Sequence, residues 1–436
     1  MLTRKTMPLM SATADLSPST ASLHGLDGVN FFLGGVLAGF GPYVAVYLAD
    51  QKWTQEKIGF VLSASALAGL LSQVPGGELL DTTRSKRVIV ALGVIVVAIS
   101  AMIIEFRPNF SLVLIGLLLQ GSTGGLLGPA ITAISLGLVG HSALSERLGR
   151  NQRFASTGSL VAAGLMGLIG YALSYQAIFL LVVGLTLPLF VALARIRAAD
   201  IHFGRSCGAP HHHTPDRPAR AVRLSLWKSP GLLVLGACLF LFQLANASML
   251  PLIGEALIYQ GESRSSLIVS ALIVLPQIIV ALMAPWVGRQ ANNWGRRPLL
   301  LIGLGALPIR ALLFALVTDT PLLLAFQLLD GVSGAVVGVM TALVIADLTN
   351  GTGRFNLAQG LVGTASGIGA SLSTALFGLI AAIFGRTVVF LSIASVALFA
   401  VLTLWFLMPE TRPSTKPAGF SHANPLNSAV PPDQYA

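Results

Sequence analysis

A few ionisable side chains lie inside long apolar stretches of this chain, and these are the residues that could do chemistry. Asp330 falls near the middle of the stretch 321–346, and Arg310 lies at a comparable depth in the stretch 298–317. A charge placed in hydrocarbon costs roughly 3 kcal/mol, so each such residue is a functional candidate. A lone carboxylate there binds a proton readily, which suits proton coupling. If Asp330 instead pairs with Arg310, the pair is structural, or proton uptake breaks it.

Asp27 is the second candidate for a proton or cation site. It lies at the start of the apolar stretch 26–48, just before Asn30. It could equally cap a helix N-terminus at the membrane surface, which is a common position for aspartate.

Other polar residues are spread singly through the apolar stretches and could line a binding cavity. They are Asn30, Tyr43, Tyr47, Gln120, Gln243, Asn246, Glu255 and Arg310. Gln243 and Asn246 share one face of a helix because they are three positions apart. This mixture of amides, phenols and few charges suits a small polar or amphipathic organic solute. Hydrogen bonding between helices explains isolated Asn and Gln about as well.

The elements that position these residues are membrane helices. Charged residues make up 10% of the 436 residues and hydrophobic ones 54%, too little charge for a soluble surface. Twelve apolar stretches are long enough to cross about 30 Å of hydrocarbon. They are 26–48, 58–80, 88–106, 110–132, 154–174, 176–195, 230–254, 266–287, 298–317, 321–346, 357–382 and 387–408. We therefore predict an all-α polytopic membrane protein with twelve transmembrane helices in two six-helix halves.

The net charge of +10 is a topology signal rather than a nucleic-acid surface. Of the 27 Lys and Arg, 21 fall on the side of the termini and the even-numbered hairpins, and 5 on the other. The positive-inside rule then places both termini in the cytoplasm. We expect the membrane to be the cell membrane, the inner membrane of a bacterium. The predicted divisions are a segment 1–25, a first half 26–195, a linker 196–229, a second half 230–408 and a disordered tail 409–436.

The linker and the cysteines offer little further chemistry. His211–His213 could bind a metal, but three adjacent histidines in a Pro-rich stretch have no preset geometry, so we predict no metal site. The linker could include a short amphipathic helix on anionic headgroups. Cys207 lies in the linker and Cys238 in an apolar stretch, so we expect no disulfide.

One short motif occurs twice, 211 residues apart when Gly77 is aligned with Gly288. Residues 76–87 read GGELLDTTRSKR and residues 288–297 read GRQANNWGRR. Each copy has Gly, three residues, Asp81 or Asn292, two residues and then a basic cluster. Each lies between two apolar stretches, so the chain is a duplication with the same charged hairpin in both halves.

The hairpin resembles the signature of the major facilitator superfamily of secondary transporters, Gly-x-Leu-x-Asp-(Arg/Lys)-x-Gly-(Arg/Lys)-(Arg/Lys). The first copy supplies Gly77, Leu79, Asp81, Lys86 and Arg87, with Arg84 where the family usually has Gly. The second supplies Gly288, Gly295, Arg296 and Arg297, with Asn292 in place of Asp. The resemblance covers roughly residues 25–408 and does not identify a subfamily.

The resemblance implies that the hairpins gate the cytoplasmic side through charges that meet in one state only. In the first half we expect Asp81 to pair with Arg84, Lys86 or Arg87. In the second half, Asp347 could pair with Arg296 or Arg297. The alternative is that these charges only fix the topology. We expect the first copy to be the functional gate and the second to be mainly structural.

The predicted function is secondary active transport of a small organic solute by alternating access, coupled to protons, by a monomer without a cofactor. Efflux is only slightly favoured over uptake, because the fifth stretch lacks the Gly-Pro signature of the family's drug–proton antiporters. A transport-inactive sensor or receptor is the main alternative, and a polytopic membrane enzyme the other. No P-loop, HExxH or GxSxG motif occurs in the sequence, which disfavours a primary pump or a hydrolase.

Overall fold

The computed structural model describes residues 18–38, 40, 42–106, 109–209, 229–259 and 265–412. Within these ranges the chain is helical apart from short connections. The elements are α1 (Thr20–Ala38), α2 (Pro42–Asp50), α3 (Gln55–Thr82), α4 (Lys86–Phe106), α5 (Phe110–Val139), α6 (Leu144–Ala172), α7 (Tyr175–Arg195), η1 (Ala198–Asp200), α8 (Phe203–Cys207), α10 (Pro230–Asn246), α11 (Met249–Tyr259), α12 (Ser265–Trp294), α13 (Arg296–Leu316), α14 (Thr320–Thr349) and α15 (Phe355–Leu407).

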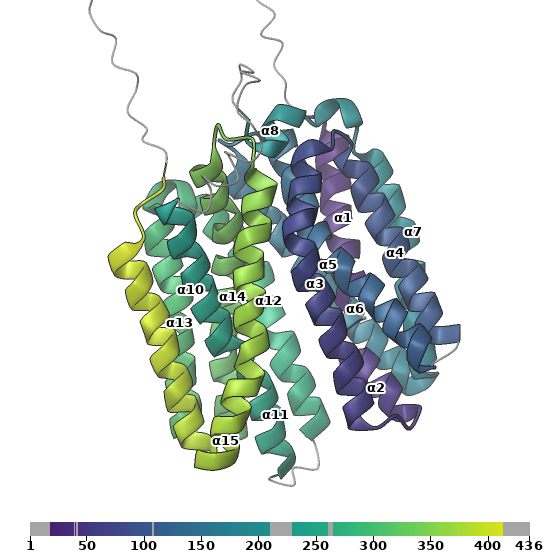
Figure 1. The fold of residues 1–436 in the computed structure, drawn as a ribbon, viewed down its shortest axis with the longest axis vertical. Helices are drawn as coiled ribbons and strands as arrows, with labels where there is room; N and C mark the ends of the chain where they lie inside the picture. Colours follow the sequence, from purple (N-terminus) through teal and green to yellow (C-terminus); the bar gives the residue numbers. More distant parts are fainter. Residues whose placement is uncertain are drawn as a thin grey trace, which may run out of the picture.

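Eleven of the described helical segments are long and apolar enough to cross a membrane. The last, α15, has 53 residues and is non-helical at Gly385, whose φ of 79° is a conformation that favours glycine. Figure 1 shows α15 running down the molecule and returning upward, so it makes two crossings. The twelve crossings predicted from the sequence are therefore accounted for.

The first and seventh crossings are each broken into two helices. The first consists of α1 and α2, and the seventh of α10 and α11, which meet at Ala247 and Ser248. At the second break Ser373 on α15 accepts a hydrogen bond from the Ser248 N–H (3.0 Å). Broken helices are tolerated in membranes where protein surrounds the freed backbone, and they often border a binding site.

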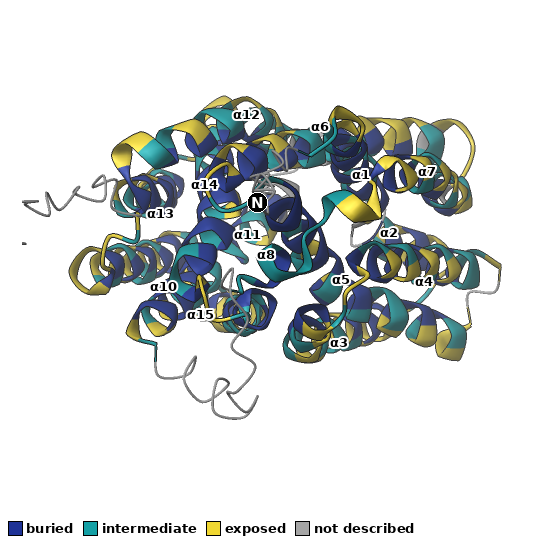
Figure 2. Cartoon of the chain, turned by 90° about the horizontal axis from the view of Figure 1, so that it is seen from above, coloured by how far each residue is buried: buried dark blue, intermediate teal, exposed yellow. Residues whose placement is uncertain are grey.

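The helices form two halves that lie side by side, α1–α7 and α10–α15 (Figure 2). One cluster of buried apolar side chains fills the first half, between Leu26 and Ile196. A second fills residues 232–408 and also takes in Leu136, Leu144 and Leu148 of the first half. Many large apolar side chains, such as Leu71, Leu187 and Phe406, are exposed, as expected of helices that face lipid.

The halves approach most closely at the end of the bundle that carries the start of α1, the end of α15 and α8 (Figure 1). We call this the terminal end. Glycines allow the contact: a Cβ on Gly77 would lie 2.4 Å from the Asn356 carbonyl oxygen, and one on Gly288 2.4 Å from that of Ser145. Gly149 meets the Ala284 carbonyl in the same way, at 2.5 Å. α3 thus packs on α15, and α6 on α12.

The predicted boundaries need three adjustments. α1 begins at Thr20, before the predicted start of the first half. The first residues of the predicted linker fold as η1 and α8, whereas 210–228, with His211–His213, lie outside the described residues. Glu410, Thr411 and Arg412 at the start of the predicted tail make defined contacts, and 413–436 lie outside the described part.

Candidate functional site

A cavity of about 480 Å³ lies between the halves, mostly against the second. Its wall is largely apolar, and its polar lining residues are Thr132, Gln243, Asn246, Gln277, Asp330, Thr341, Gln359 and Ser366. A second cavity of about 210 Å³, lined in part by Asn30, Asn151 and Gln152, shares four lining residues with the first. Cavities of this size and mixed polarity suit small organic molecules.

Asp330 and Arg310 form an ion pair at the wall of the larger cavity. The Asp330 side chain is 29% exposed, whereas that of Arg310 is 2% exposed and lies behind it. Arg310 Nη2 donates to Asn246 Oδ1 and lies 3.2 Å from Met249 Sδ, so the break between α10 and α11 holds the guanidinium. Arg310 Nε has no hydrogen-bond partner among the described residues. The pairing of Asp330 with Arg310, which the sequence left open, is therefore present. Of the two side chains, only the Asp330 carboxylate lines the cavity.

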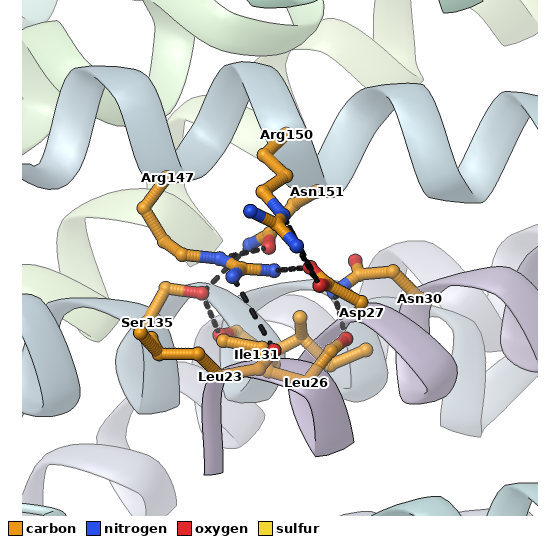
Figure 3. Close-up of polar contacts among 9 residues, drawn as sticks. All are labelled: Leu23, Leu26, Asp27, Asn30, Ile131, Ser135, Arg147, Arg150 and Asn151. Atoms are coloured by element: carbon orange, nitrogen blue, oxygen red, sulfur yellow. Dashed lines mark hydrogen bonds and ion pairs between the residues drawn. The ribbon is translucent and has the colours of Figure 1, made fainter. Parts of the chain in front are cut away.

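Asp27 lies in a separate cluster near the terminal end, between α1 and α6 (Figure 3). Its carboxylate accepts from Arg147 Nη2 and Arg150 Nη2, both at 2.5 Å. Arg147 also binds Asn151 (2.7 Å), whose amide donates to Ser135 on α5 (2.7 Å). Asp27 is inside α1 rather than at its start, so the predicted N-cap is wrong. Its side chain is 7% exposed and is fully engaged by two arginines.

Asp81 at the end of α3 contacts the start of α15 in the other half. Its carboxylate accepts from the backbone N–H groups of Asn356 (3.1 Å) and Leu357 (2.9 Å) and from Asn356 Nδ2 (2.8 Å). The expected partners were wrong: exposed Arg84 is not among the described partners of Asp81, nor is Arg87, and Lys86 donates to the Leu80 and Thr83 carbonyls. A carboxylate at a helix N-terminus is favoured by the helix dipole and the free N–H groups. We call this the Asp81–α15 contact.

The start of the linker covers the Asp81–α15 contact. The Cys207 thiol donates to the Asp81 carbonyl (3.3 Å) and accepts from Lys86 Nζ (3.5 Å). Asn356 Nδ2 donates to the Ser206 carbonyl (3.1 Å). Burial raises the pKa of the Cys207 thiol, and the nearby Lys86 ammonium offsets this in part. The segment therefore binds both halves and shields a thiol of low reactivity.

A second set of polar contacts joins the halves, between the turn after α5 and the end of α14. His141 Nε2 lies 2.9 Å from Asp347 Oδ1, without the alignment of a good hydrogen bond. The other Asp347 oxygen accepts from Arg296 Nε (2.8 Å), one of the pairings expected from the sequence. Asn292 Oδ1 accepts from Arg296 Nη1 (3.3 Å). In the second half the hairpin charges are thus satisfied mainly within that half, and His141 supplies the cross-half contact.

Glu410 takes the place at α13 that Asp81 takes at α15. It accepts from the backbone N–H groups of Arg296 (2.8 Å) and Arg297 (3.1 Å). Gly295, with φ of 94°, precedes these residues, and a Cβ there would lie 2.5 Å from Glu410 Oε2. The turn glycine of the second hairpin therefore makes room for this cap.

Several predicted cavity residues lie elsewhere. Tyr47 is fully buried in the first half, with its hydroxyl near the Ile104 carbonyl (3.4 Å). Tyr43 donates to the Ala163 carbonyl (3.0 Å), and Gln120 accepts from Ser65 (3.3 Å), so both serve helix packing. Gln243 and Asn246 line the larger cavity and Asn30 the smaller one. Glu255 is in α11, but its side chain lies outside the described part.

The sequence analysis missed four residues that bind the predicted site residues. Arg147 binds Asp27, His141 contacts Asp347, Asn356 binds Asp81, and Glu410 binds the backbone of Arg296. Arg147 entered the sequence analysis only as one of the 27 Lys and Arg counted for topology, and the other three residues were not considered.

Comparison with known proteins agrees with this architecture. The profile of the Major Facilitator Superfamily matches residues 26–273 and 232–430. An uncharacterized MFS-type transporter of Mycobacterium tuberculosis is 33% identical over 403 residues, covering 92% of this chain and 96% of its own. The chain belongs to the major facilitator superfamily. It is accordingly a multi-pass membrane protein of a family of secondary transporters.

Other similarities to superfamily members are partial or structural. The class B tetracycline resistance protein of Escherichia coli is 31% identical over 136 residues, which is 31% of this chain and 33% of that protein. A proton:xylose symporter superposes with a TM-score of 0.69 at 15% identity, covering 90% of this chain and 96% of its own. The E. coli fucose:proton symporter gives 0.68 at 16%, covering 90% and 98%. These two likenesses concern the fold.

Proposed function

We propose that this superfamily member is a proton-coupled transporter of a small amphipathic organic solute, and that the larger cavity is its binding site. The observation that carries the proposal is the ion pair of Asp330 and Arg310 at the cavity wall. Asp330 reaches the cavity, so a proton can arrive there, whereas Arg310 is buried and fixed. Protonation of the carboxylate removes its attraction to the guanidinium, and so changes the contacts of α14 with α13.

The terminal end is proposed to face the cytoplasm of a bacterial inner membrane, and the conformation to be closed on that side. The Lys and Arg distribution supports the first statement. The Asp81–α15 contact, the linker segment and the close glycine contacts at that end support the second. Alternating access then requires these contacts to break while the halves rock around the cavity.

Export remains the expected direction for a solute that accumulates in the cell, and the partial similarity to a tetracycline resistance protein supports it. A monomer is sufficient, since each half supplies walls to one cavity. The Asp27 cluster, with both arginines bound, is proposed to fix α1 against α6 rather than to carry protons.

The test is transport by the full chain reconstituted in lipid vesicles under an imposed proton gradient, against a panel of anionic, neutral and cationic aromatic solutes. We expect wild type to accumulate at least one of them. Asp330→Asn should lose accumulation while it still exchanges solute across the membrane in counterflow. Absence of transport of any solute would favour a sensor instead. Accumulation that survives Asp330→Asn would move proton coupling to another residue.

A further inference from the structure

The charges at the cavity wall sum to zero in the empty protein. Asp330 is the one ionisable residue among the described lining residues, and Arg310 directly behind it balances its charge. The cavity faces of α10, α12 and α15 contribute uncharged groups such as Gln243, Gln277 and Gln359. Glu255 in α11 has a side chain outside the described residues. The site thus holds one buried positive side chain, Arg310, and a proton can neutralise its counter-charge on Asp330.

Proton binding alone would leave Arg310 without a counter-charge. Its side chain is 2% exposed, and a buried charge that loses its partner is strongly destabilising. An organic anion bound to Arg310 at the same time restores neutrality. An anion without the proton would instead meet the ionised Asp330 and leave a net negative site. The empty form and the doubly loaded form are therefore the two neutral ones.

The hydrogen-bond geometry of Arg310 fits an anionic ligand. Asn246 and Met249 engage Nη2, which leaves Nη1 facing Asp330 and Nε without a hydrogen-bond partner in the described part of the chain. When Asp330 is protonated and turns aside, Nη1 is free to donate a charge-assisted hydrogen bond to a carboxylate or sulfonate in the cavity. Phe242, Leu239 and Val337 line the same cavity and offer apolar contact to the body of the solute.

We propose that the site binds a proton on Asp330 and an amphipathic organic monoanion on Arg310 together, and that the halves exchange orientation only when both or neither are bound. This rests on the proposed function and names its substrate class and ion. The two then move in the same direction without net charge. The combined gradients set that direction, so an acid that accumulates in the cell leaves with a proton.

A cationic solute would behave in the opposite way. It would displace Arg310 from Asp330 and leave the site with a net positive charge, just as a proton does. Cation and proton would then compete for Asp330, so the cation would bind without proton uptake. Proton uptake on binding therefore separates the two substrate classes.

The first test is calorimetric binding to the purified full chain in two buffers of different ionisation enthalpy. The probes are naphthalene-2-sulfonate, 2-naphthol and 2-naphthylmethylammonium, which share one ring system. We expect the sulfonate to bind best, with about one proton taken up, and its affinity to fall as the pH rises. Stronger binding of the ammonium probe, without proton uptake, would overturn the proposal.

Variants identify the residues. Asp330→Asn mimics the protonated acid, so the sulfonate should bind with no proton uptake and little pH dependence. Arg310→Lys keeps the charge and should weaken binding, whereas the neutral double variant Asp330→Asn with Arg310→Gln should abolish it, a loss of at least about 100-fold. Arg386→Gln is the matched control, because Arg386 donates to the Phe314 and Val317 carbonyls away from the cavity. Unchanged sulfonate binding in the double variant would also overturn the proposal.

Transport separates failure of this inference from failure of the proposed function. In vesicles, sulfonate uptake should follow the pH gradient and be insensitive to a clamped membrane potential. If neutral or cationic probes are transported and the sulfonate is not, the transporter assignment stands and the anion site is wrong. If none of the probes is transported while the protein is folded by its melting curve, the proposed function fails.

Discussion

Asp27 and Asp330 are both paired with arginine, and their surroundings assign them different roles. Asp330 reaches the cavity and has one partner, Arg310. Asp27 is 7% exposed and has two partners, of which Arg147 is 4% exposed and Arg150 50% exposed. Asp27 is therefore held in place by its partners, whereas Asp330 is open to the contents of the cavity.

Asp27→Asn should therefore damage stability rather than proton coupling. It leaves the buried Arg147 charge without its counter-ion, at a cost of roughly 3–5 kcal/mol, while half-exposed Arg150 adds little. We expect a clearly lower melting temperature in detergent and an unchanged number of protons per solute in the protein that folds. The double variant Asp27→Asn with Arg147→Gln should recover part of the loss. A normal melting temperature together with lost coupling would contradict this assignment.

Asp81→Asn should weaken closure at the terminal end. The carboxylate accepts three hydrogen bonds from the start of α15, and an amide placed there brings its own N–H₂ against those donors. We expect a loss of about 1.5 kcal/mol, or about tenfold in the ratio of closed to open protein. The rate at which a maleimide modifies Cys207 should rise accordingly. Glu56→Gln, at the exposed first turn of the same helix, should leave that rate unchanged.

For single residues, the sequence identified the functional candidates more reliably than it identified the partners of those residues. Asp330 and Arg310 were selected because a charge within an apolar stretch needs a reason, and Asp81 and Asp347 because of the duplicated hairpin and the resemblance it carries. Their partners depend on which helices of the two halves meet, and the spacing along one chain does not contain that information. Asn356 lies 275 positions from Asp81, so its role became visible only with the fold.

Among the helices, the contact of α6 with α12 depends on two glycines that face each other's backbone. A Cβ on Gly288 would lie 2.4 Å from the Ser145 carbonyl oxygen and 3.2 Å from the Gly149 Cα. Gly288→Val should therefore separate the helices at the terminal end, at about 1–3 kcal/mol, and raise Cys207 modification. Gly305→Val is the control, because nothing lies within 4 Å of a Cβ at Gly305. Equal effects of the two changes would mean that the contact does not hold the closed form.

The start of α1 is fastened to η1 by a group that responds to acid. The hydroxyls of Ser19 and Ser22 donate to Asp200 (2.5 and 2.7 Å) and lower its pKa. A lowered pKa means that the stabilisation is complete at neutral pH and is lost as the pH falls through the folded value, below about 4. Because Asp200 is half-exposed, we expect less than about 1 kcal/mol. The protection of the first turn of α1 against hydrogen exchange, relative to the intrinsic exchange rate at the same pH, should fall in acid and in Asp200→Asn at neutral pH, whereas that of α13 should not.

For the molecule as a whole, hydropathy and the duplicated hairpin predicted twelve crossings in two halves, and the family follows from the same residues. The division of the first and seventh crossings into two helices each was not predicted, because apolar composition continues from α1 to α2 and from α10 to α11. Arg310 donates to Asn246, directly before the break between α10 and α11. Hydropathy therefore does not reveal the break that positions Arg310.

Membrane sidedness and alternating access can be tested together with Cys207. The chain has two cysteines, so Cys238→Ala leaves Cys207 as the single thiol. Cys207 is 3% exposed beneath the linker segment in this conformation, and burial raises its pKa, so reaction with a maleimide requires the terminal end to open. We expect a membrane-impermeant maleimide to label it slowly, from the cytoplasmic side alone, and about tenfold faster when Asp81→Asn is added. Labelling from the opposite side would reverse the proposed topology. Rapid labelling that ignores Asp81 would show that the Asp81–α15 contact does not govern closure, even if the orientation is correct.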